Sequence, residues 1–128
     1  MSTLSSPGIV PVLPSSDIKR DIIWYEQFTG FKYYFGDDGY IGLRRDDLEI
    51  HLQLHRGTEE DPMPDGSAIR IFVNDIHPWY EEFVEKGTIS KDKLRLDTPW
   101  KTHEFGFYDL NRNAIFIVQD TVSQGNTG

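Results

Sequence analysis

Polar side chains with the donors and acceptors needed for binding or catalysis alternate along one short stretch of the chain. In the segment 48–55, leucine and isoleucine occupy every second position, and the positions between them are Glu49, His51, Gln53 and His55. A period of two predicts a β-strand with its polar side chains on one face. The two histidines are four residues apart, about 13 Å on a strand, which is too far to bind one metal ion. The stretch therefore predicts a polar sheet face, either ligand-binding or merely solvated.

The rest of the chain lacks the residue arrangements typical of covalent catalysis. It has no cysteine, which excludes disulfides, thiolate metal sites and cysteine nucleophiles, and it has no recognisable Ser-His-Asp arrangement. A net charge of −8 argues against a nucleic-acid surface, which needs clustered lysine and arginine. The same charge attracts cationic ligands, although acidic residues that only maintain solubility explain it equally well.

The elements that position the polar strand belong to a module that occurs twice. The sequences WYEQF at 24–28 and WYEEF at 79–83 each fall on a predicted helix that follows a strand-like stretch. Similar elements surround both copies in the same order. This order predicts two β-α-β-β-β modules, one at about 8–55 and the other at about 67–120. The segment 56–66 between them is rich in glycine, proline and acidic residues and is typical of a linker.

Capping residues and turns divide each module into its elements. Ser16 or Asp17 caps the first helix, which ends near Gly30, and Asn74 or Asp75 caps the second. The expected strands are 8–13, 31–35, 40–43 and 48–55 in the first module, and 67–73, 94–96, 104–108 and 114–118 in the second. Because the first strand contains a proline, we expect it at a sheet edge or as an arm exchanged between subunits.

Alternation also assigns the two faces of the predicted sheets. If His51 faces a cleft, Arg70 and Phe116 face it by the same parity. The apolar residues between these positions then form the core under the helices: Leu48, Ile50, Leu52, Leu54, Ile69, Ile71, Val73, Ile115 and Ile117. We expect the helical Trp24 and Trp79 to pack in this core as well.

Length and hydropathy set the domain organisation. A chain of 128 residues fits one domain with its own core. No apolar run approaches the roughly 20 residues of a membrane helix, and the segment 1–6 lacks the basic region and apolar core of a signal peptide. We expect a single domain over 1–128 in the cytoplasm.

Three stretches carry a family resemblance. They are Ile-Val-Pro-Val-Leu at 9–13 with Asp-Ile after it, the stretch 39–52, and Pro-Trp-Lys-Thr-His-Glu-Phe at 99–105 followed by Asp-Leu-Asn-Arg-Asn at 109–113. In order and spacing they resemble the vicinal oxygen chelate superfamily, which includes glyoxalase I, fosfomycin-resistance enzymes, extradiol dioxygenases and bleomycin-resistance proteins. The bleomycin-resistance branch is the most similar, with Pro-Trp-Gly-x-Arg-Glu-Phe and then Asp-Pro-x-Gly-Asn. The resemblance covers about residues 8–120.

The resemblance implies an α+β fold in which the two modules form a curved mixed sheet around a cleft. It also implies where the superfamily's enzymes would hold a metal, at positions that fall on Val10, His51, Ala68 and Phe116. Three of these residues offer no lone pair to a divalent ion, and a shift of the alignment by one residue brings in no better ligand. We therefore expect no metal, no cofactor and no enzymatic activity.

The function that the resemblance implies is binding and sequestration of a bleomycin-type cationic glycopeptide antibiotic without chemistry. The implied form is a homodimer with its ligand grooves at the subunit boundary; dimers of this branch often exchange the N-terminal strand, and whether this chain does so stays open. Two alternatives stay open: a binding protein for another small metabolite, and a metal-dependent lyase, isomerase or dioxygenase of the same superfamily.

The candidate ligand-binding residues are Tyr33, Phe35, Tyr40, Glu49, His51, Gln53, Arg70, Trp100, Glu104 and Phe116. Aromatic side chains among them would stack on planar rings of the drug. Glu49 and Glu104 would meet its positive charge. Arg70 opposes this interpretation, unless it pairs with a carboxylate on the inner face.

Overall fold

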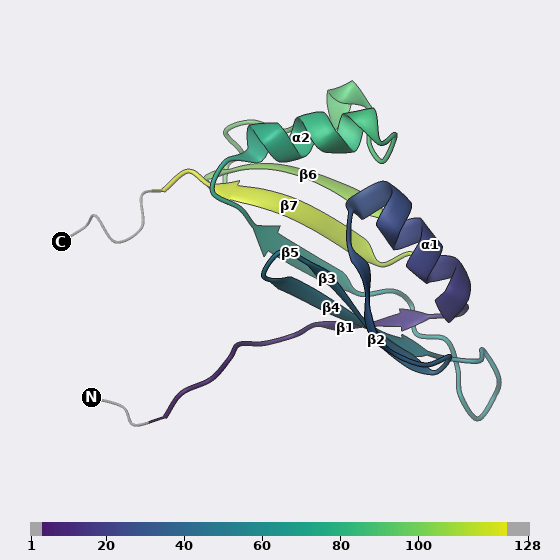
Figure 1. Ribbon diagram of the computed structural model, residues 1–128. Coiled ribbons are helices and arrows are strands. Elements are labelled where there is room, and N and C mark those ends of the chain that lie inside the picture. The colour runs from purple at the N-terminus through teal and green to yellow at the C-terminus, as the bar shows by residue number, and fades with distance from the viewer. Residues whose placement is uncertain (1–3, 123–128) are drawn as a thin grey trace.

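The computed structural model describes residues 4–122 as two β-sheets and two α-helices, a mixed α+β architecture (Figure 1). The first module contains β1 (Val12–Ser15), α1 (Ile18–Thr29), β2 (Lys32–Gly36), β3 (Tyr40–Arg45) and β4 (Leu48–Leu54). The second contains β5 (Ala68–Phe72), α2 (Ile76–Glu85), a 3-10 turn at Lys91–Lys93, β6 (Thr102–Tyr108) and β7 (Ala114–Asp120). The predicted fold class is confirmed.

The two sheets repeat one topology, except that the second lacks a strand. Their strand orders are β1-β4-β3-β2 and β5-β7-β6, and in each the strand before the helix pairs in parallel with the last strand of its module. The strand predicted at 94–96 is wrong, because only Arg95 forms a bridge, with Glu104 of β6. Asp97 then takes a left-handed backbone conformation with φ of 52°, and a tight turn follows in which the N–H of Thr98 donates to the carbonyl of Thr102, the first residue of β6.

Both helices begin at a predicted capping residue. The Asp17 side chain accepts a hydrogen bond from the backbone N–H of Arg20, and Asp75 accepts one from the N–H of His77. These bonds satisfy N–H groups that have no partner within the helix. Gly30 ends α1 with φ of 76°, a conformation that glycine adopts without strain.

One hydrophobic cluster joins the two modules. The helices cover the same side of the sheets, and the cluster between them includes Tyr25 and Phe31 of the first module and Phe83 and Phe105 of the second. All nine predicted core residues belong to it or pack against it, as do Trp24 and Trp79. Each fully buried side chain of this size contributes about 1.5–3 kcal/mol through burial. Within the described range 4–122, no helix covers the opposite side of either sheet.

The segment before β1 extends away from the rest of the chain (Figure 1). The strand predicted at 8–13 begins only at Val12, and the preceding Ile9 is 96% exposed. The carbonyl of Pro11 still accepts a hydrogen bond from the backbone N–H of His51, but proline has no N–H to extend the ladder. No helix among the described residues is long and apolar enough to span a membrane.

Candidate functional site

Tyr40, His51 and Glu49 form a chain of hydrogen bonds on the uncovered face of the first sheet. The Nδ1 atom of His51 lies 2.7 Å from the Tyr40 hydroxyl oxygen, and its Nε2 atom lies 2.6 Å from Glu49 Oε2. A carboxylate only accepts hydrogen bonds, so Nε2 carries a proton. In the neutral ring, Nδ1 then accepts the Tyr40 hydroxyl proton. The imidazole is therefore held in one orientation between two polar partners.

Aromatic rings surround this imidazole because β2 contains a bulge. The pairing of β2 with β3 shifts between Tyr33 and Phe35, so Tyr34 and Phe35 both lie on the uncovered face. The Phe35 ring lies 5.1 Å from the His51 ring, centroid to centroid, and covers Gly42, where an added Cβ would come within 2.1 Å of it. Glycine at that position therefore makes room for the ring.

Because of the bulge, Tyr33, one of the predicted ligand-binding residues, does not lie on this face. Tyr33 pairs with the buried Leu43 and shares its side of the sheet, and its hydroxyl donates to the Gly36 carbonyl. Two residues that do lie on this face, Tyr34 and Arg44, were not predicted from the sequence. The Arg44 guanidinium lies 4.6 Å from the centroid of the Tyr34 ring. Arg44 has the same parity as Tyr40 along β3, a signal that was present in the sequence.

Glu104 organises the uncovered face of the second sheet. Its Oε1 atom accepts hydrogen bonds from Arg70 at 2.9 Å, Trp100 Nε1 at 2.8 Å and the Thr102 hydroxyl at 2.6 Å. Burial alone would raise the pKa of Glu104, but these three bonds outweigh it and hold the pKa below the ordinary value. Glu104 is only 2% exposed, so its carboxylate positions Arg70 and Trp100 rather than facing solvent.

Phe116 lines the same face in a way that parallels Phe35. Its ring covers Gly106, where an added Cβ would lie 2.6 Å from the ring. The Arg70 guanidinium lies 5.6 Å from the Phe116 centroid and 5.9 Å from the Phe72 centroid. Each sheet thus presents an aromatic ring over a glycine, and each has a partly exposed arginine paired with a carboxylate.

A cavity connects the two faces. It has a volume of about 220 Å³ and lies between β4 and β5, with Glu49 on one side and Arg70 on the other. The predicted residues Phe35, Tyr40, Glu49 and His51 gather on the first sheet, and Arg70, Trp100, Glu104 and Phe116 gather on the second. Gln53 lies on β4 with an exposed side chain. We call these two uncovered faces together the groove, as a name for the surface; of the predicted residues, only Glu49 and Arg70 line the cavity between them.

The groove offers hydrogen-bonding and stacking surfaces. Among residues 4–122, no group of three or more histidine, aspartate or glutamate side chains is arranged to hold a metal ion. The predicted metal-ligand positions Ala68 and Phe116 supply no donor atom in any case. The Tyr40–His51–Glu49 chain joins a hydroxyl, an imidazole and a carboxylate, the groups of an acid–base relay.

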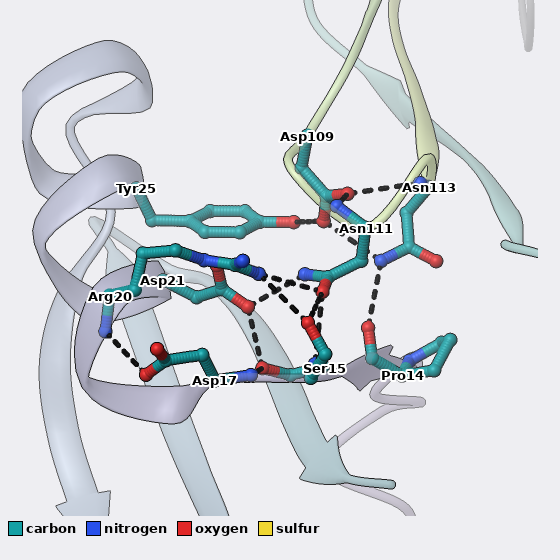
Figure 2. A network of polar contacts seen from close by, with 10 residues as sticks. Pro14, Ser15, Asp17, Arg20, Asp21, Tyr25, Asp109, Asn111 and Asn113 are labelled. Carbon is teal, nitrogen blue, oxygen red and sulfur yellow. Dashed lines mark hydrogen bonds and ion pairs between the residues drawn. The ribbon is translucent and has the colours of Figure 1, made fainter. Parts of the chain in front are cut away.

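A second polar network holds the modules together away from the groove (Figure 2). The Tyr25 hydroxyl of α1 donates to Asp109 Oδ2 at 2.5 Å, and Asn113 donates to the same atom at 2.8 Å. Burial, and then the Asp109 carboxylate, hold the pKa of Tyr25 well above its ordinary value. Asn111 also reaches across to Asp21 of α1 at 2.6 Å. The stretch 109–113, part of the family resemblance, is therefore an interlock between modules.

Comparison with known proteins places this geometry in context. No protein-family model matches the chain. A bleomycin resistance protein from Geobacillus stearothermophilus is 25% identical over 128 residues, which cover 89% of this chain and 97% of that protein. Proteins of the same name from Staphylococcus aureus match equally well.

Solved structures share the fold. A bleomycin resistance determinant encoded on the transposon Tn5 superposes with a TM-score of 0.74 at 22% identity, over 90% of this chain and 98% of that one. A bleomycin-binding protein complexed with bleomycin gives a TM-score of 0.71 at 24% identity, over 88% and 98%. A glyoxalase/bleomycin resistance protein/dioxygenase from Nocardioides gives 0.70 at 18% identity, over 98% and 91%.

Proposed function

We propose that this chain, a homologue of bleomycin resistance proteins with the glyoxalase/bleomycin-resistance fold, binds a bleomycin-type glycopeptide antibiotic and sequesters it unchanged. The observation that supports this most is the fold it shares with a protein solved in complex with bleomycin. The groove supplies what such a guest needs: two aromatic walls for its planar rings, and ordered polar groups between them. We place this activity in the cytoplasm.

Within the groove, each side chain has a proposed role. Phe35, Trp100 and Phe116 stack on rings of the drug. The Tyr40 hydroxyl oxygen accepts a hydrogen bond from the drug, and His51, held in turn by Glu49, fixes the orientation of that hydroxyl. Glu104 acts through the groups it positions, because its own carboxylate is buried.

We further propose that the active form is a homodimer. β1 pairs with β4 only from His51 onward, so among residues 4–122 no strand lies beside that edge of β4 at 48–50, and β5 is an edge strand as well. The cavity between these edges includes Ile9 and Pro11 of the exposed arm in its lining. The arm of a second copy is the occupant we expect, because an extended segment there would pair with both edges and shield apolar surface. The groove would then lie at the subunit boundary.

Titration with copper(II)-bleomycin tests the proposed function. Trp100 is half exposed in the groove, whereas Trp24 and Trp79 pack against the core, so a bound drug should quench mainly Trp100 fluorescence. We expect saturable quenching at micromolar drug in the native protein and a much smaller signal in Trp100→Phe. N-acetyltryptophanamide serves as the control for collisional quenching by copper. Unsaturable quenching that matches this control would remove the antibiotic assignment.

A further inference from the structure

The free edge of β6 borders a second cavity, which shares Phe116 with the groove. Its volume is about 470 Å³, within the usual range for small-molecule sites. It lies where a fourth strand would complete the second sheet, between β6 and the segment 88–95. Its lining includes Ser90, Lys93, Arg95, Gly106, Tyr108 and Phe116. We call it the β6-edge pocket.

Backbone groups of β6 point into this pocket. Glu104 exchanges two backbone hydrogen bonds with Arg95, at 2.8 and 2.9 Å, so its N–H and carbonyl face away from β7. In an antiparallel ladder this orientation recurs at every second residue. Gly106 and Tyr108 therefore face the same way, and across this edge neither has a partner within residues 4–122. The pocket thus contains unpaired backbone donors.

The charge of the lining is opposite to that of the protein. The chain has 21 acidic and 13 basic residues, yet the pocket is lined by Lys93 and Arg95 and by no aspartate or glutamate. Both cations are exposed, and no carboxylate of the described residues lies within 4.0 Å of either. Arg95 instead lies 5.0 Å from the centroid of the Trp100 ring. The Ser90 hydroxyl chiefly, and Lys93 to a smaller extent, hold the pKa of Asp92 below its ordinary value, so Lys93 has a carboxylate nearby. Within residues 4–122 neither cation forms an ion pair, which leaves both able to meet an anion with an aromatic body.

We propose that the β6-edge pocket binds a small aromatic carboxylic acid. The aromatic body packs against Phe116 and Tyr108, the carboxylate lies between Lys93 and Arg95, and the N–H of Gly106 donates to an oxygen of the ligand. Charge-assisted bonds from arginine and lysine favour the ionised acid over a neutral analogue of the same shape. This ligand class goes beyond the cationic antibiotic, and Lys93 has no part in the proposed drug binding.

Calorimetric titration with 1-naphthylacetate and 1-naphthylacetamide tests this proposal, since the two probes share one body and differ in charge. We expect the acid to bind about tenfold more tightly than the amide, and Lys93→Gln or Arg95→Gln to remove most of that difference. Lys91→Gln is the matched control, because Lys91 belongs to the same 3-10 turn but does not line the pocket.

Equal affinity for acid and amide, or no heat from either at millimolar concentration, would overturn the proposal. The proposal would also fail if Lys91→Gln reduced the preference for the acid over the amide as much as Lys93→Gln does, because this would indicate a diffuse charge effect. These titrations contain no drug, so their failure leaves the antibiotic assignment standing. Failure of the copper(II)-bleomycin titration would in turn leave the acid site standing.

Discussion

At the scale of single residues, the groove carboxylates act through their neighbours. Glu49 holds His51, and Glu104 holds Arg70 and Trp100. Sequence parity predicted correctly that Glu49, His51 and Arg70 share the uncovered faces. It gave no information on hydrogen-bond partners, because these depend on pairings between strands that are far apart in the chain.

Replacing Tyr40 by phenylalanine tests the role of the Tyr40–His51–Glu49 chain. The change removes the hydroxyl bonded to His51 and should cost about 1 kcal/mol of stability. We also expect weaker binding of copper(II)-bleomycin in the fluorescence titration. Tyr33→Phe is the control, since Tyr33 lies on the opposite side of the sheet and should leave affinity unchanged. An equal loss of drug affinity in Tyr40→Phe and Tyr33→Phe would contradict a specific role for Tyr40.

Glu104 should make stability depend on pH. Because its pKa in the folded protein is below the ordinary value, its ionised form adds stability at neutral pH. That contribution is lost as pH falls below the ordinary glutamate range and through the lowered pKa. Urea unfolding between pH 7 and 3 should therefore show a smaller acid-induced loss in Glu104→Gln than in the native protein. If the free energy of unfolding fell equally with pH in the two proteins, Glu104 would not be the source of the pH dependence.

At the scale of elements, the bulge in β2 sets which side chains lie on the groove side, and the interlock joins α1 to the turn 109–113. The strands predicted at 31–35 and 40–43 do pair as β2 and β3, but the bulge in β2 places Tyr34 instead of Tyr33 on the groove side. A bulge of this kind leaves no reliable mark on the alternation of a strand that is exposed along its whole length. The missing strand at 94–96 has a similar cause, because the left-handed conformation of Asp97 has no simple sequence signal.

Tyr25→Phe should loosen the interlock between α1 and the turn 109–113. The substitution leaves the buried Asp109 without one of its donors, and we expect a loss of about 1–3 kcal/mol in the free energy of unfolding. Denaturant unfolding followed by circular dichroism measures it. Tyr80→Phe provides the comparison, since that hydroxyl donates to the Lys91 carbonyl at an exposed position and should contribute less. An unchanged midpoint for Tyr25→Phe would mean that the network adds no stability.

At the scale of the whole molecule, the repeated module explains both the shared core and the groove. Helices cover one side of each sheet, and the other sides adjoin at the cavity between β4 and β5. The duplicated WYEQF and WYEEF sequences were sufficient to predict the two modules. They could not predict the relative position of the two sheets, which depends on packing between Tyr25, Phe83 and their neighbours.

Removing residues 1–10 tests the proposed dimer. If the arm of one copy fills the cavity between β4 and β5 of the other, its deletion should shift the protein toward the monomer in sedimentation velocity. A single Ile9→Asp substitution should act in the same direction, because it would bring a charge next to apolar surface. Ile23→Asp is the matched control on the exposed side of α1. A native protein that sediments as a monomer at all concentrations would contradict the dimer.

The most direct measurement of the central claim combines capture of the drug with its recovery. The protein is mixed with excess copper(II)-bleomycin, the complex is isolated by gel filtration, and the drug released by denaturation is quantified and weighed by mass spectrometry. Stoichiometric binding without chemistry predicts one drug molecule per protomer and an unchanged drug mass. A drug that does not co-elute with the protein, or one recovered with an altered mass, would contradict it.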